Sequence, residues 1–138
     1  MALHVTDLRI VYRTLKGDVQ AIDGVSFSIA DGEIMGLAGE SGSGKTTLGK
    51  ALIRMDSRMR HLGGEVELDG RRLPIDDDRA MNAYRFTEIS IVPQYAMSAL
   101  NPIRRIGQMI GELLRSRGIK FATVRDELDR RLALVGLP

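Results

Sequence analysis

The pattern of apolar and polar positions predicts an antiparallel sheet in the first part of the chain. Apolar residues alternate with polar ones over residues 3–12, and a second strand or hairpin arm follows over 19–30, after the turn signal at 16–18. A period of two is typical of strands that bury one face. A third alternating run, residues 65–70, ends in an Asp-Gly dipeptide that favours a tight turn. We therefore predict antiparallel strands with one solvated face.

Two further runs are apolar at nearly every position, residues 33–38 and residues 89–92. Continuous short runs of this kind are typical of strands that are buried on both faces of a parallel sheet. Pro93 closes the second run, because proline has no N–H to donate to a neighbouring strand. The two runs predict a thin parallel core beside the antiparallel strands.

Helical spacing appears between the two runs and again towards the end of the chain. Leu48, Ala51, Leu52 and Met55 recur at the spacing of one helix face. Further helices are predicted over 76–84, 103–114 and 124–135, the last with a capping box that begins at Thr123. The charged runs 54–60 and 125–131 are interpreted as solvated helix faces. The predicted fold class is therefore α/β.

Composition narrows the functional classes. The chain has 138 residues, the length of a single domain. Its 20 basic and 18 acidic residues leave a net charge of +2. These charges are interspersed, whereas a nucleic-acid binder is expected to carry a clustered basic face. The lack of cysteine excludes disulfides and thiolate metal sites. No signal-peptide run or membrane-spanning stretch is apparent, so we expect a soluble chain that reaches a membrane, if at all, from its surface.

The most informative stretch is Gly39-Glu40-Ser41-Gly42-Ser43-Gly44-Lys45-Thr46. It fits the phosphate-binding loop of P-loop nucleotide hydrolases and kinases, and it lies between a predicted strand and a predicted helix, as that loop requires. Gly42 and Gly44 allow the backbone to turn its N–H groups inward, towards the point at which the helix directs its unpaired amides. Lys45 can then reach the β- and γ-phosphates, and the Thr46 hydroxyl can bind Mg²⁺. The alternative is a Gly/Ser-rich turn that binds nothing.

With two further residues, this loop resembles the nucleotide-binding domain of ABC transporters. Tyr12 precedes the loop at the family's adenine-stacking position, and Gln94 follows it at the position of the Q-loop glutamine. The resemblance covers the whole chain in family order. Two stretches resemble the sequences of the ATPase subunits of oligopeptide, dipeptide and nickel importers: residues 39–45 and Met97-Ser98-Ala99-Leu100-Asn101-Pro102.

The resemblance implies a P-loop nucleotide hydrolase of ABC type, with an antiparallel β-subdomain, a partial parallel core and the start of a helical subdomain. Residues 1–138 would form an incomplete ABC nucleotide-binding domain. Its parts would be the β-subdomain with its phosphate loop (about 1–75, loop 39–47), the Q-loop region (about 89–102) and the start of the helical subdomain (about 103–138).

The same resemblance implies ATP and Mg²⁺ as cofactors. Catalytic roles fall on Lys45 and Gln94, and metal binding falls on Thr46 and Gln94. The nucleotide would be bound by Tyr12, Gly39, Glu40, Ser41, Gly42, Ser43, Gly44, Lys45, Thr46 and Thr47, the last at the α-phosphate. The implied partners are permease subunits that dock near residues 95–105 and a second ATP-binding subunit, with no nucleic acid. The implied location is cytoplasmic, peripheral on the inner face of the cell membrane.

The sequence also departs from the family pattern. Pro93 and Tyr95 flank the glutamine where the peptide branch usually has Phe before it and Asp or Gly after it. No run of four apolar residues followed by Asp and Glu supplies a Walker B motif, and neither a signature motif nor a switch histidine is found. Residues 61–64 are expected to interrupt the regular structure between the predicted helix and the strand at 65–70. The run 62–65 is interpreted as a turn.

Without Walker B carboxylates, we expect very poor turnover by this chain alone. We also expect an exposed apolar edge, with marginal stability or self-association. The alternatives are a non-hydrolytic nucleotide-binding module or truncated remnant and, less favoured, a small P-loop kinase or GTPase. The sequence contains no Asn-Lys-x-Asp motif, with which a GTPase reads its base. A kinase would need an arginine-rich lid over the phosphates, and residues 125–131 resemble such a lid only weakly.

Overall fold

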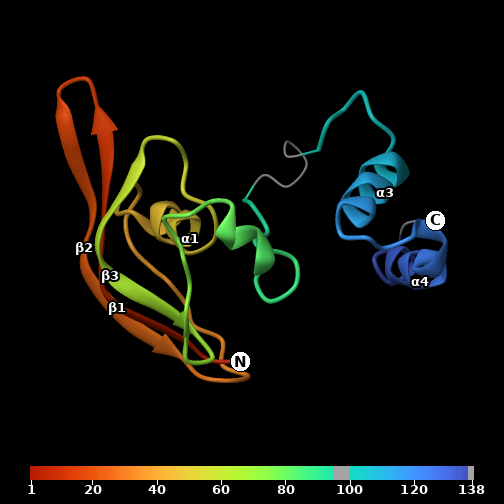
Figure 1. Cartoon of the computed structure of the whole chain (residues 1–138), viewed down its shortest axis with the longest axis horizontal. Coiled ribbons are helices and arrows are strands. Elements are labelled where there is room, and N and C mark those ends of the chain that lie inside the picture. The colour runs from red at the N-terminus through yellow and green to blue at the C-terminus, as the bar shows by residue number, and fades with distance from the viewer. Residues whose placement is uncertain (95–99, 137–138) are drawn as a thin grey trace. The chain divides into compact units, whose positions relative to one another are not determined.

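A computed structural model describes residues 1–94 and 100–136 of the chain. The chain divides into two compact units, Met1–Ile91 and Val92–Pro138 (Figure 1). The first contains the strands and the phosphate loop, and the second contains the two helices near the C-terminal end of the sequence. Each unit is described by itself.

A four-stranded sheet in the order β2-β1-β3-β4 dominates the first unit. Its strands are β1 (Leu3–Thr14), β2 (Gly17–Ile29), β3 (Met59–Leu68) and β4 (Arg71–Arg72), and every neighbouring pair is antiparallel. Figure 1 shows β1 between β2 and β3. The alternating runs at 3–12, 19–30 and 65–70 therefore predicted strands correctly.

The interruption predicted at 61–64, with its turn at 62–65, is wrong. The whole stretch lies within β3, where Arg9 pairs with Gly63 and Ile10 pairs with His61. A register shift between Thr6 and Arg9 absorbs the irregularity as a β-bulge. Gly64 has φ +86, and a Cβ there would lie 2.3 Å from the Asp7 carbonyl oxygen. The glycines thus allow close contact within the sheet, and they do not end the strand.

A compact aliphatic core lies between the sheet and helix α1 (Lys45–Ile53). The helix contributes Leu48 and Ala51, which are buried, while Leu52 and Met55 pack against the same core from its margin. This outcome confirms the predicted apolar stripe, although the helix ends before Met55. The remaining buried members come from the strands and from the segment that follows β4: Val5, Leu8, Ile10, Ile22, Met59, Val66, Leu68, Leu73, Ile75 and Met81.

The two predicted parallel strands do not form among the described residues. Residues 33–38 have no strand assignment, and Ile34 is 96% exposed. Residues 89–92 contribute only one isolated parallel bridge, between Arg85 and Ile89, and Val92 is 86% exposed. A strand requires hydrogen-bonding neighbours, and in the described residues neither run is bonded into the sheet. The observed architecture is mixed α/β with an antiparallel sheet.

The short polar helix predicted at 76–84 is a single 3₁₀ turn, η1 (Ala80–Ala83), that buries Met81 completely. The Asp77 carboxylate accepts hydrogen bonds from the backbone N–H groups of Arg79 and Ala80, at 2.9 and 3.0 Å. These bonds satisfy amides at the start of the turn, as a helix cap does. The predicted helix is therefore reduced to one short turn with a single buried side chain.

The second unit consists of α3 (Ile106–Ser116), η2 (Phe121–Thr123) and α4 (Arg125–Leu134), none of which has a buried side chain. Both predicted helices are present, and α3 ends before Gly118, which has φ +72. The predicted capping box is wrong, because the Thr123 hydroxyl donates to the Lys120 carbonyl and α4 has no side-chain cap.

Within α4, hydrogen bonds from Arg130, the larger cause, and from Arg131 lower the pKa of the Glu127 carboxyl. Across the described ranges, no helix is long and apolar enough to cross a membrane.

Candidate nucleotide-binding site

The phosphate loop leads directly into α1, and Gly44 forms the junction. Gly44 is the helix N-cap, with φ 92 and ψ 3 in the left-handed region. A Cβ at Gly44 would lie 2.8 Å from the Ala21 carbonyl oxygen of β2, so only glycine fits without a backbone shift. The Leu48 N–H donates to the Gly44 carbonyl at 2.8 Å and closes the first helical turn. The amino end of α1 therefore lies directly against β2.

Lys45 folds back over the loop that precedes it. Its Nζ donates to the carbonyl oxygens of Gly39 and Glu40, at 2.7 and 2.6 Å, and approaches the Ser43 Oγ at 3.4 Å. The Ser43 N–H donates to the Glu40 carbonyl at 3.2 Å and tightens the same turn. The ammonium group is therefore held against the loop backbone, and the first-turn amides of the helix that begins at Lys45 also favour an anion.

The two threonines that follow Lys45 face different surroundings. Thr46 is exposed, whereas Thr47 is half-buried and its hydroxyl lies 3.3 Å from the hydroxyl of Tyr12. Glu40, Ser41 and Ser43 are exposed. The exposed Thr46 hydroxyl is an oxygen ligand of the kind that Mg²⁺ prefers. Thr47 instead connects α1 to the strand that carries Tyr12.

Tyr12 lies near the end of β1, where it pairs with Val19 of β2 and Met59 of β3. Its half-buried ring packs against the core, and the Arg58 guanidinium carbon lies 5.9 Å from the ring centroid. The ring thus has a packed part and a hydroxyl directed at the first turn of α1. The structure thus places the Tyr12 hydroxyl next to the phosphate-loop helix, and the adenine-stacking role of the ring stays a prediction.

Sequence reasoning missed Arg58. It falls in the charged run 54–60, which was interpreted as a solvated helix face, but α1 ends at Ile53 and Arg58 immediately precedes β3. The Arg13 N–H donates to the Arg58 carbonyl at 2.8 Å, which holds this residue beside β1. No local pattern marked Arg58, because its contact with Tyr12 depends on the pairing of β1 with β3.

The first unit therefore brings together Tyr12 and residues 39–47, from β1, the loop and α1. Gln94 is an exposed residue of the second unit, and its role stays a prediction. The predicted permease-docking region, 95–105, lies partly outside the described residues, which omit 95–99.

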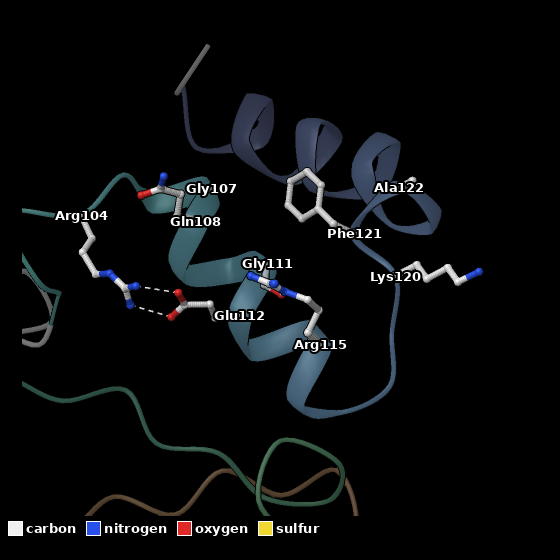
Figure 2. A pocket seen from close by; sticks show the side chains of 9 residues that line it. All are labelled: Arg104, Gly107, Gln108, Gly111, Glu112, Arg115, Lys120, Phe121 and Ala122. Carbon is white, nitrogen blue, oxygen red and sulfur yellow. Dashed lines mark hydrogen bonds and ion pairs between the residues drawn. The ribbon is translucent and has the colours of Figure 1, made fainter.

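Two cavities help to delimit the site. One, of about 350 Å³, is apolar and lies beside Lys45, between β2, residues 35–37 and α1. The other, of about 630 Å³, belongs to the second unit (Figure 2). Figure 2 shows the Arg104 guanidinium facing the Glu112 carboxylate, with two hydrogen bonds of 2.6 Å between them. None of the predicted nucleotide-binding residues lines this larger cavity, so we do not assign the nucleotide to it.

Comparison with known proteins assigns the family. The model of the ABC transporter family matches residues 22–137, which include the phosphate loop, α1 and both C-terminal helices. The chain belongs to the ABC transporter family. This membership confirms the predicted P-loop ATPase fold class, implies ATP binding and argues against the kinase and GTPase alternatives.

Similar ABC proteins carry names from peptide transport. The chain is 35% identical over 137 residues to the oligopeptide transport ATP-binding protein OppD of Salmonella typhimurium, and 34% identical over 137 residues to OppD of Escherichia coli. It is 33% identical over 139 residues to the dipeptide transport ATP-binding protein DppD of Bacillus subtilis. Each match covers 99% of this chain but only 41%, 41% and 42% of these relatives, respectively.

Proposed function

We propose that this chain is the ATP-binding part of an ABC transporter ATPase that powers solute import, with peptides as the solute. Support comes from the family match over residues 22–137 and from relatives named for oligopeptide and dipeptide transport. The observation that carries the proposal is the position of Lys45, whose Nζ is held over the loop by the Gly39 and Glu40 carbonyls.

The contacts of Lys45 explain how a phosphate would bind. An ammonium group has three donors, and two of them are engaged at 2.7 and 2.6 Å. The contact with Ser43 Oγ, at 3.4 Å, is the weakest, and a β- or γ-phosphate oxygen would replace it at little cost. The loop carbonyls would continue to orient the ammonium group, while the amides of the first turn of α1 would receive the other phosphate oxygens. Tyr12 would supply the stacking surface for adenine.

Mg²⁺ fits the donors that the first unit offers, because the exposed hydroxyl of Thr46 leaves its oxygen accessible at the start of α1. We propose Thr46 as one ligand. For Gln94, which belongs to the second unit, the role of Mg²⁺ ligand is a proposal that rests on the family resemblance alone. The ion, when bound, supplies positive charge that stabilises the phosphate oxygens. Within the described ranges, no group of three or more His, Asp or Glu residues could hold a metal ion alone, so the nucleotide itself would complete the coordination.

The other proposed roles concern the assembled transporter. We propose docking of permease subunits near residues 95–105, pairing with a second ATP-binding subunit, and a position on the cytoplasmic face of the cell membrane. Residues 1–75, 89–102 and 103–138 would be the β-subdomain, the Q-loop region and the start of the helical subdomain. The sequence has no Walker B motif, so we propose that the chain alone binds ATP without efficient turnover.

A titration with Mg-ATP tests this proposal. Saturable binding by the unaltered chain is expected, and Lys45→Ala should weaken it by at least about tenfold, since hydrogen bonds to charged groups contribute about 1.5–3 kcal/mol. Lys50→Ala is a matched control, because Lys50 is an exposed lysine in the last turn of the same helix. It should change the affinity by less than about twofold, as expected for a surface position. A folded chain that does not bind ATP would refute the proposal.

A further inference from the structure

The hydroxyl groups of Tyr12 and Thr47 lie 3.3 Å apart, although the residues are 35 positions apart in the sequence. One belongs to β1 and the other to the first turn of α1. This is a direct side-chain contact between the aromatic residue and the phosphate-loop helix. Its geometry permits either hydroxyl to donate.

Both partners are positioned by contacts of their own. Tyr12 is paired on both sides within the sheet, with Val19 and Met59, so its backbone cannot shift along the strand. Thr47 lies next to Leu48, which is buried and whose N–H closes the turn at Gly44. The remaining freedom of the Tyr12 ring is rotation about its side-chain bonds, and the contact with Thr47 restricts that rotation.

We propose that this hydroxyl pair positions the Tyr12 ring relative to the phosphate loop, so that base stacking and phosphate binding reinforce each other. The inference rests on the proposed ATP binding. A preoriented ring does not lose rotational freedom when the base stacks on it, and a ligand gains affinity when a binding group is preorganised. Thr47 is thus a positioning residue for the base, and Tyr12 must be a tyrosine because phenylalanine lacks the hydroxyl.

A double-mutant cycle on the affinity for Mg-ATP tests the inference, with Tyr12→Phe, Thr47→Val and the double variant of the full chain. Each single change should weaken ATP binding about 3- to 10-fold, the range of a typical net hydrogen bond. The double variant should be no more than about twofold weaker than the weaker single variant, because the two changes remove the same interaction. Thr47→Ser, which retains the hydroxyl, should preserve the affinity.

Two controls separate positioning from damage to the fold. Tyr84→Phe removes a hydroxyl from another half-buried tyrosine, which also has an arginine, Arg71, 5.9 Å from its ring centroid, and it should leave ATP affinity unchanged. Tripolyphosphate, which has phosphates but no base, should bind the unaltered chain and Tyr12→Phe equally. General damage to the fold would lower the affinities for ATP and for tripolyphosphate together.

The outcomes distinguish this inference from the proposed function. If the unaltered chain binds ATP but the losses of the two single variants multiply in the double variant, or neither variant loses affinity, the hydroxyl pair does not position the ring. An equal loss of tripolyphosphate and ATP affinity in Tyr12→Phe would also overturn the inference. If the unaltered chain does not bind ATP, the proposed function fails and the inference fails with it.

Discussion

At the scale of single residues, glycines and Lys45 determine the geometry of the candidate site. The loop motif predicted that the backbone needs glycine at positions 42 and 44, and both have positive φ, +83 and +92. The motif could not reveal that the two glycines differ in their surroundings. A Cβ at Gly44 would lie 2.8 Å from the Ala21 carbonyl oxygen, whereas a Cβ at Gly42 would have nothing within 4 Å. Gly44 is therefore constrained both by its positive φ and by the close Ala21 carbonyl, whereas Gly42 is constrained by its positive φ alone.

This difference predicts unequal costs for two otherwise similar substitutions. Gly42→Ala should lower the free energy of unfolding by about 1–2 kcal/mol, the cost of a left-handed conformation for a residue with a Cβ. Gly44→Ala should lower the free energy of unfolding by about a further 1–3 kcal/mol beyond the loss in Gly42→Ala, because the backbone of β2 or α1 must also move. Urea unfolding of the two variants and the unaltered chain measures both values. Equal losses would show that the contact with Ala21 does not constrain the site.

At the scale of elements, the segment over 33–38 is the clearest departure from expectation. Its apolar composition predicted a buried strand, yet Ile34 is 96% and Leu37 is 55% exposed. Met35 and Leu37 border the apolar cavity of about 350 Å³ beside α1. Apolar residues that gather beside an open apolar cavity are typical of interaction surfaces or of aggregation sites. The segment is an exposed apolar stretch outside the sheet, whereas we expected an exposed edge of the strand that leads into the phosphate loop.

Self-association is the expected consequence of this exposed apolar segment. Replacing Ile34 and Leu37 together with serine should lower the association constant of the chain at least about tenfold, since burying one large apolar side chain contributes about 1.5–3 kcal/mol. Sedimentation velocity over a range of concentrations measures the change. Leu15→Ser is the control, because Leu15 is a fully exposed leucine in the turn between β1 and β2. An unaltered chain that stays monomeric with a cooperative melt would contradict this expectation.

At the scale of the whole molecule, stability is distributed unequally between the two units. Every buried apolar side chain of the described residues lies in Met1–Ile91, whereas α3, η2 and α4 bury none. Because apolar burial is the main favourable contribution to folding, the first unit should account for nearly all of the unfolding free energy. The second unit relies on helix-forming sequence and on surface ion pairs, which contribute little in water.

The two units can be tested separately. A fragment of residues 1–91 should retain the sheet signal in circular dichroism and the urea midpoint of the full chain. It should also bind ATP, because Tyr12 and residues 39–47 all lie within it, although it lacks Gln94, the proposed second ligand of Mg²⁺. A fragment of residues 92–138 should unfold without a cooperative transition, since isolated short helices are marginal in water. Failure of the longer fragment to fold would show that its core depends on the second unit.

The sequence by itself determined those features that depend on neighbouring residues. Period-two alternation located β1 and β2, apolar spacing located α1, α3 and α4, and the glycine-rich motif located the phosphate loop. Each signal is local, because side-chain direction repeats every two residues in a strand and about every 3.6 in a helix.

Tertiary structure decided the features that depend on a distant partner. The course of β3 through its glycines required the bulge opposite Asp7, and the contact of Arg58 with Tyr12 required the pairing of β1 with β3. Residues 33–38 are apolar enough for a strand but have no strand partner among the described residues. Composition can therefore favour a strand, but only a hydrogen-bonded neighbour completes it. The contact between Tyr12 and Thr47 depended instead on the packing of α1 against the sheet.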